Sequence, residues 1–196
     1  MKFPKKYISI DVEASGEYPW DSSMISFGAC IIDGKFDKTF YAELKPISKN
    51  YVLENFEVGA SKLNILSKYN YNEFNPEEVL KILKDKGEKP KVSMLRFSYW
   101  IAENTLNYEP KLVADNNLFD GMFISYYLSK FYNKKNPFGH SSENSNSVFK
   151  GASRNINASI KDLGFRNTEK QHNALEDAVN QAKEFWTSLI HIGYKL

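Results

Sequence analysis

The sequence predicts an α/β fold in which a mixed sheet is flanked by helices. Three segments with alternating apolar side chains open the chain, at Lys6–Val12, Met24–Ile32 and Lys38–Leu44. Asp33-Gly34 is a hairpin signal between the second and third segments, so the three should form an antiparallel meander. Helical patterns around one short apolar strand fill the rest of the chain, a mixture that is typical of a sheet covered by helices.

Each later element is predicted from its own local pattern. The expected elements are helices at Pro76–Lys84 and Val92–Asn104, a strand at Lys111–Ala114, and helices at Leu118–Phe131, near Ala158–Leu163 and from Asn173 onward. In the last helix, apolar side chains recur at spacings of three and four, which predicts the side that faces the core. These side chains are Leu175, Val179, Ala182, Trp186 and Leu189.

Length and composition predict one compact domain over residues 1–196. The chain has 42% hydrophobic and 15% aromatic residues, enough for a substantial core. Its formal net charge of +2 is too small to indicate nucleic-acid binding by itself. The single cysteine, Cys30, cannot form an internal disulfide and is expected in the core. No apolar run approaches the ~18 residues of a membrane span and no signal peptide is visible, so the cytoplasm is the expected location.

The first candidate site residues are two acids at the end of the first strand. A period of two puts Ile8, Ile10 and Val12 on one face and Asp11 and Glu13 on the other. The two carboxylates therefore point the same way. The small-residue turn that follows, residues 14–16, should leave backbone amides accessible beside them. The alternative is a polar strand face that meets water.

A third acid, Asp120, lies where a helix is expected to begin. The alternative role for an acid at this position is to stabilise the helix N-terminus, where the dipole favours a negative charge by about 0.3–1 kcal/mol. However, Asp120 interrupts an apolar run that includes Phe119 and Phe123. An acid in such surroundings needs a polar partner.

His172 and Asp177 come at the start of the last helix. The histidine is expected on the loop above the first turn, and the acid on the same side of the helix. Alternatively, Asp177 is a solvated helix acid and His172 a residue of the helix cap.

In this order, the acids and the histidine resemble the DEDDh (DnaQ-like) 3′-5′ exonucleases of the ribonuclease H-like superfamily. The resemblance runs from Lys6 to about Trp186 and is strongest in Ile8–Gly16 and His172–Ala178, with weaker support from Phe119-Asp120 and Asn136–His140. There are two departures. Asp115 is an extra acid near the site, and Asn144 stands where relatives often carry an aspartate, so altered loop anchoring is expected there.

The resemblance implies a mixed five-stranded sheet flanked by helices and a two-metal exonuclease. Asp11, Glu13 and Asp177 would be the inner metal ligands, Asp120 would hold the second metal, and His172 would be the general base. Acidic ligands without cysteine favour Mg²⁺ or Mn²⁺ on chemical grounds, and two ions about 3.5–4 Å apart suit phosphodiester hydrolysis. Neutral imidazole, with an ordinary pKa of about 6.5, can accept a proton from water.

The expected substrate is the 3′ end of a single strand, from which nucleoside 5′-monophosphates are released. DNA is slightly preferred; the alternatives are an RNA-trimming or oligoribonucleotide-degrading enzyme, a catalytically silent binding module, or a purely structural role. Expected substrate contacts are Ala14, Ser15, Tyr18 and Phe123, while Trp20 is expected to pack its loop onto the sheet. The oligomeric state stays open, with a homodimer as one option.

Residues 133–157 are dense in Asn, Ser, Gly and Lys, which predicts a long irregular connection. Two roles are open: an exposed loop without function, or a mobile rim of the site. In the second case Lys150, Arg154 or Arg166 would meet phosphate groups, and the sequence does not select among the three.

Overall fold

A computed structural model describes residues 4–132, 134–166 and 171–194. Its five strands form one sheet in the order β3-β2-β1-β4-β5. The strands are β1 (Lys5–Ala14), β2 (Met24–Ile31), β3 (Thr39–Glu43), β4 (Glu109–Ala114) and β5 (Glu143–Asn144). Strands β1, β2 and β3 pair antiparallel, whereas β4 is parallel to β1 and β5 is parallel to β4. The predicted mixed five-stranded sheet and its antiparallel meander are confirmed.

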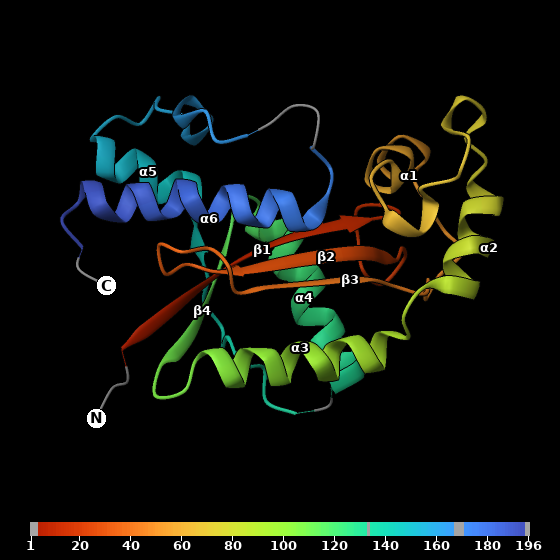
Figure 1. The fold of residues 1–196 in the computed structure, drawn as a ribbon, viewed down its shortest axis with the longest axis horizontal. Helices are drawn as coiled ribbons and strands as arrows, with labels where there is room; N and C mark the ends of the chain where they lie inside the picture. The colour runs from red at the N-terminus through yellow and green to blue at the C-terminus, as the bar shows by residue number, and fades with distance from the viewer. Residues whose placement is uncertain (1–3, 133, 167–170, 195–196) are drawn as a thin grey trace.

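Helices cover both faces of this sheet (Figure 1). The helices are α1 (Leu53–Ala60), α2 (Pro76–Lys86), α3 (Pro90–Asn104), α4 (Met122–Tyr127), α5 (Ser145–Ser153) and α6 (Ala174–His191), of which α1 and α2 lie at one end of the sheet. Helix α6 packs on β1 and β2 and carries α5 beside it, while α3 and α4 lie on the opposite face. Within the described part of the chain, no helix is both long and apolar enough to cross a membrane.

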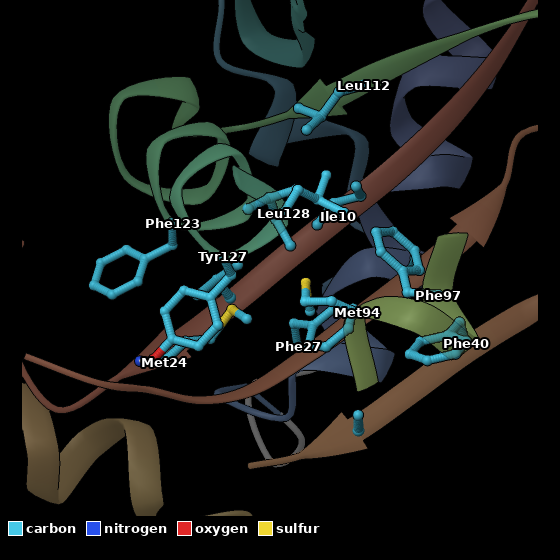
Figure 2. Close-up of a cluster of buried hydrophobic side chains, with 14 of the residues drawn as sticks. Ile10, Met24, Phe27, Phe40, Met94, Phe97, Leu112, Phe123, Tyr127 and Leu128 are labelled. Carbon is cyan, nitrogen blue, oxygen red and sulfur yellow. Dashed lines mark hydrogen bonds between the residues drawn. The ribbon is translucent and has the colours of Figure 1, made fainter. Parts of the chain in front are cut away.

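The alternation in β1 sends its side chains into two different cores. Ile8, Ile10 and Val12 are buried in the larger core, against α3 and α4. Figure 2 shows the centre of this core, where Phe97 of α3 and Tyr127 of α4 converge on the sheet. The Tyr127 hydroxyl accepts a hydrogen bond from the Met24 backbone N–H at 2.8 Å, so the ring is buried with its polar atom satisfied. Full burial of each large side chain contributes about 1.5–3 kcal/mol.

The interpretation of residues 133–157 as irregular is wrong for its second half. That stretch contains β5 and helix α5, which begins where the Asn144 side chain accepts a hydrogen bond from the Ser147 backbone N–H at 2.7 Å. Asn144 is a helix cap, and its sequence context resembles a loop because capping and loop formation favour the same residue types. Helix α1 is not predicted by the sequence either, because Val52 at its start gives no capping side chain.

The predicted helix Leu118–Phe131 and the predicted buried side of the last helix also need correction. The first is divided into a π-helical turn at Asn117–Gly121, α4, and a second π-helical turn at Leu128–Tyr132. The helix expected near Ala158–Leu163 is only a 3₁₀ turn at Ile160–Leu163. In α6, Ala182 and Leu189 are buried as predicted, but Leu175, Val179 and Trp186 are only half-buried, and further buried side chains are Ala174, Ala178, Gln181, Glu184 and Phe185. The small side chains of Ala174 and Ala178 on this buried face fit the close approach of β2 and α6.

This close approach is centred on Gly28 of β2. A Cβ atom at this position would lie 2.3 Å from the Ala174 carbonyl oxygen and 2.5 Å from the Leu175 Cα. We expect Gly28→Ala to lower the free energy of unfolding by about 1–3 kcal/mol, the usual cost of overpacking, because backbone atoms cannot yield as a flexible side chain can. Denaturant unfolding measures this loss. Gly151→Ala in α5 is the control: its Cβ would meet no atom within 4 Å, so it should be neutral or stabilising.

Candidate active site

Five of the predicted site residues line one cavity of about 390 Å³. Asp11 and Glu13 come from β1, Asp120 from the π-helical turn after β4, and His172 and Asp177 from the start of α6. Segments from the two ends and the middle of the chain therefore meet there. The remaining lining residues are Val12, Asp115, Asn116, Phe119, Lys161, Arg166, Gln171 and Gln181.

Three carboxylates converge at distances that suit cation binding. One oxygen each of Asp11, Glu13 and Asp177 lies within 4.8 Å of the other two. Asp120 lies deeper: its side chain is 4% exposed, and its Oδ1 accepts a hydrogen bond from the Val12 backbone N–H at 3.1 Å. The backbone of β1 thus supplies the polar partner that an acid in an apolar segment requires.

His172 is fixed between two of these acids. Its φ of +68° lies in the left-handed region, which is uncommon for a residue other than glycine. Its backbone N–H donates to Asp177 Oδ2 at 2.8 Å, and its Nδ1 lies 3.8 Å from Glu13 Oε1. The Asn173 side chain then caps α6 by accepting from the backbone N–H groups of residues 175 and 176. The imidazole is half exposed, so it faces the cavity and remains accessible.

The four acids are buried or half-buried and lie close to one another, and their pKa values are raised as a result. Burial, followed by the carboxylates of Asp120, Glu13 and Asp177, raises the pKa of Asp11 well above its ordinary value. Burial also raises the pKa of Glu13 to about 6 and that of Asp120 to about 8. It raises the pKa of Asp177 as well, although the His172 N–H opposes the shift.

The ring of His172 responds to the same cluster. The side-chain contact with Glu13 raises the pKa of His172, with burial opposing. Oxygen donors that repel one another when ionised, with no thiolate among them, fit a hard divalent cation such as Mg²⁺ or Mn²⁺.

Two of the expected substrate contacts lie away from the surface. Phe123 is fully buried in the core (Figure 2), so it is not placed to meet bases, and Phe119 of the preceding turn lines the cavity instead. Ser15 is also fully buried, and its N–H donates to the Ser23 carbonyl oxygen at 2.8 Å. The turn after Glu13 therefore does not offer the Ser15 amide to a ligand. Ala14 is buried but borders a second hollow of about 320 Å³.

Tyr18 and Trp20 stack on each other, with ring centroids 5.0 Å apart and the planes 15° from parallel. They are 47% and 60% exposed, so Trp20 does not pack its loop onto the sheet as expected. The pair is therefore pre-assembled and open to solvent.

Several cavity residues are not found by sequence reasoning. Phe119 and Gln181 could have been found, because each shares a turn or helix stripe with a candidate acid. Lys161 carries no signal beyond its charge. Of the three basic residues considered as phosphate contacts, Arg166 lines the cavity, and Lys150 and Arg154 are not among its lining residues. In the second hollow, Glu54, Asn55 and Val58 come from α1, the helix that the sequence does not predict.

A ribonuclease H-like sheet with four acids and a histidine around one cavity defines an exonuclease of the DEDDh class. The family model of the Rv2179c-like 3′-5′ exoribonuclease domain matches residues 6–189. The chain belongs to this family, and the predicted membership of the DEDDh exonucleases is confirmed.

Similar proteins agree with this assignment. The chain is 31% identical over 185 residues to the 3′-5′ DNA exonuclease Cap18 of Escherichia coli, a match that covers 91% of this chain and 89% of that protein. Its fold is similar to the nuclease domain of 3′hExo bound to rAMP, with a TM-score of 0.67, 15% identity, and coverage of 97% of this chain and 94% of that one. It is also similar to cell-death related nuclease 4, with a TM-score of 0.68, 16% identity and 96% coverage, where it spans only 64% of that chain.

Proposed function

We propose that residues 1–196 form one exonuclease domain that uses two divalent cations to hydrolyse single-stranded nucleic acid from its 3′ end, releasing nucleoside 5′-monophosphates. The observation that carries this proposal is the convergence of Asp11, Glu13, Asp120, Asp177 and His172 on one cavity. Family membership supports the 3′-5′ polarity.

The acids divide into two groups by position. Asp11, Glu13 and Asp177 would hold one Mg²⁺ or Mn²⁺, because their oxygens already lie within 4.8 Å of one another. The more deeply buried Asp120 would hold the second ion, directly or through water. When bound, the two ions would activate the attacking water, neutralise charge on the phosphoryl oxygens and stabilise the leaving 3′-oxygen.

His172 is proposed as the general base. Its Nδ1 faces Glu13, which leaves Nε2 as the nitrogen that can take a proton from the attacking water. The hydrogen bond from the His172 backbone to Asp177 ties the ring's position to an acid of the cluster. Proton acceptance and cation binding are thus assigned to different side chains.

Single-stranded DNA is the proposed preferred substrate, and RNA is the second candidate. The similarity to a DNA exonuclease over nearly the whole chain supports DNA, whereas the family description names an exoribonuclease. Tyr18, exposed and stacked on Trp20, is proposed to stack on a base of either substrate, since stacking does not depend on the 2′-position.

All five site residues line the cavity, so a silent binding module has no observation in its favour.

A time course on matched DNA and RNA single strands, each labelled at either the 5′ or the 3′ end, tests the proposal. A 5′-labelled strand should shorten stepwise, and a 3′-labelled strand should release labelled mononucleotide at once. Faster shortening of DNA would support the preferred substrate, and faster shortening of RNA would favour the second candidate. Internal cuts or release from the 5′ end would contradict the proposed polarity.

A further inference from the structure

Asp115, the extra acid of the cavity, has all of its polar groups engaged. Its N–H donates to the Gln181 side-chain oxygen, and its carbonyl oxygen accepts from Asn144 Nδ2 at 2.7 Å. Its Oδ1 accepts from the Ser145 hydroxyl at 3.1 Å, and its Oδ2 accepts from Arg166 Nη2 at 2.7 Å. Both carboxylate oxygens therefore hold protein partners, and Asp115 is not part of the group Asp11, Glu13 and Asp177 whose oxygens converge within 4.8 Å.

Arg166 joins Asp115 to a second acid. Its Nε lies 2.9 Å from Glu184 Oε1, and its Nη2 lies 2.9 Å from Glu184 Oε2. The Glu184 side chain is fully buried, whereas those of Arg166 and Asp115 are 22% and 27% exposed. A planar guanidinium can hold two carboxylates in fixed directions, which a lysine ammonium cannot do.

The two acids belong to the segments that deliver the metal-binding carboxylates. Asp115 directly follows β4 and precedes the π-helical turn that carries Asp120. Glu184 lies on α6, the helix that carries Asp177. Arg166 therefore connects the segment of Asp120 to the helix of Asp177.

Gln181, next to Glu184 along the buried face of α6, extends these contacts to β1. Its Nε2 donates to the Ser9 hydroxyl at 2.7 Å and to the Ile10 carbonyl oxygen at 3.1 Å, immediately before Asp11. Through Gln181 and Arg166, α6 is thus tied to the segments that supply Asp11 and Asp120.

We infer that Asp115, Arg166 and Glu184 form a positioning triad, which sets the separation between the acids of the metal site; the inference rests on the proposed function. Two other roles for Arg166 make different predictions. As a phosphate contact it would have to use Nη1, because its Nε and Nη2 already donate to carboxylates. As a simple counter-charge it would weaken cation binding, so its removal would strengthen that binding.

The test compares wild type, Arg166→Gln and Arg166→Lys in two measurements. One is the affinity for Mn²⁺, obtained by titration, and the other is the steady-state kinetics of trimming a single-stranded oligonucleotide from its 3′ end. Both variants should lose about 10–100-fold in Mn²⁺ affinity or kcat, the usual effect of removing a group that orients metal ligands, while KM stays within about twofold of wild type. Asp115→Asn should show a loss in the same direction.

Other patterns would overturn the triad. Tighter Mn²⁺ binding in Arg166→Gln with a wild-type-like Arg166→Lys would show a counter-charge, and a raised KM with unchanged Mn²⁺ affinity would show a phosphate contact. If wild type is active and the Arg166 variants keep its Mn²⁺ affinity and kcat, only the positioning triad is overturned. A wild type that neither binds Mn²⁺ nor trims substrate would overturn the proposed function and the triad together.

Two controls separate positioning from a loss of fold. Arg166→Gln combined with Glu184→Gln removes the buried unpaired charge, so this double variant should be more stable than Arg166→Gln alone and still show the lower Mn²⁺ affinity or kcat. Arg96→Gln removes another arginine, whose Nη1 bonds both carboxylate oxygens of Glu88 at 2.8 and 2.7 Å. It should leave Mn²⁺ affinity and kcat unchanged. An equal loss in Arg96→Gln would overturn the triad.

Discussion

Asp11→Asn should reduce the trimming rate by at least about 10³-fold while the protein stays folded. A divalent cation supplies several kcal/mol of transition-state stabilisation, and each ~1.4 kcal/mol is a factor of ten in rate. Asp11 is the acid whose pKa is raised by burial and then by three neighbouring carboxylates, so it lies at the centre of the cluster. Chelation of the cations by EDTA should stop wild-type trimming in the same assay.

At pH values where Asp11 is ionised, the same substitution should stabilise the metal-free protein, because it removes one of the repelling charges. Melting in EDTA measures this gain, and Asp85→Asn on the exposed surface of α2 is the control that should change neither rate nor melting temperature. Undiminished trimming by Asp11→Asn, or by wild type in excess chelator, would rule out the two-metal proposal.

The cluster also predicts how metal-free stability depends on pH. A carboxyl group with a raised pKa binds its proton more tightly in the folded state than in the unfolded state, so stability falls as the pH rises through the shifted range. For Glu13 and Asp120 this range extends from about pH 4 up to about 6 and 8. Mn²⁺ should therefore raise the melting temperature more at pH 8 than at pH 5. An equal rise at both pH values would contradict the ionised cluster.

The first strand is predicted correctly because the alternation of its side chains between two faces depends only on the strand itself. The period of two in β1 places Ile10 in the core and Asp11 at the cavity, whatever the partners of the strand are. The same reasoning is only partly correct for α6: Ala182 and Leu189 are buried as predicted, but the buried polar residues are missed. Gln181 and Glu184 face the sheet because partners far along the chain satisfy them: the hydroxyl of Ser9 for Gln181, and the guanidinium of Arg166 for Glu184. Hydrophobic periodicity cannot reveal buried polar residues whose partners are distant in sequence.

Phe119 lines the cavity in place of the expected Phe123, and the reason is again structural. Sequence periodicity assumes a regular helix through this region, but the turn at Asn117–Gly121 is π-helical. A π-helical turn contains more residues than an α-helical one, so it changes which side chains face the core. The aromatic residues themselves predict a buried segment, and only the direction of each ring depends on the turn.

His172→Ala should lower kcat by about 10²–10⁴-fold, the usual range for removal of a general base, while Mn²⁺ affinity and KM stay near those of wild type. The reason is positional: His172 contacts the acids through its backbone N–H and its Nδ1, and the backbone contact survives in alanine. In wild type, the rate should fall as the pH drops through the pKa of His172, because protonated imidazole cannot accept a proton. The Glu13 contact raises that pKa, which moves this acidic limb to higher pH.

Water activated by a cation can ionise in the same pH range, so the acidic limb alone does not identify the base. The comparison of wild type with His172→Ala identifies it. Full kcat against pH profiles should show the acidic limb of wild type reduced or shifted in His172→Ala, with its Mn²⁺-induced rise in melting temperature retained. His191→Ala, at the exposed C-terminal end of α6, is the matched control and should behave as wild type. If His172→Ala trims single strands at a near wild-type rate, then His172 serves only to shape the start of α6, and the proton must go to another acceptor.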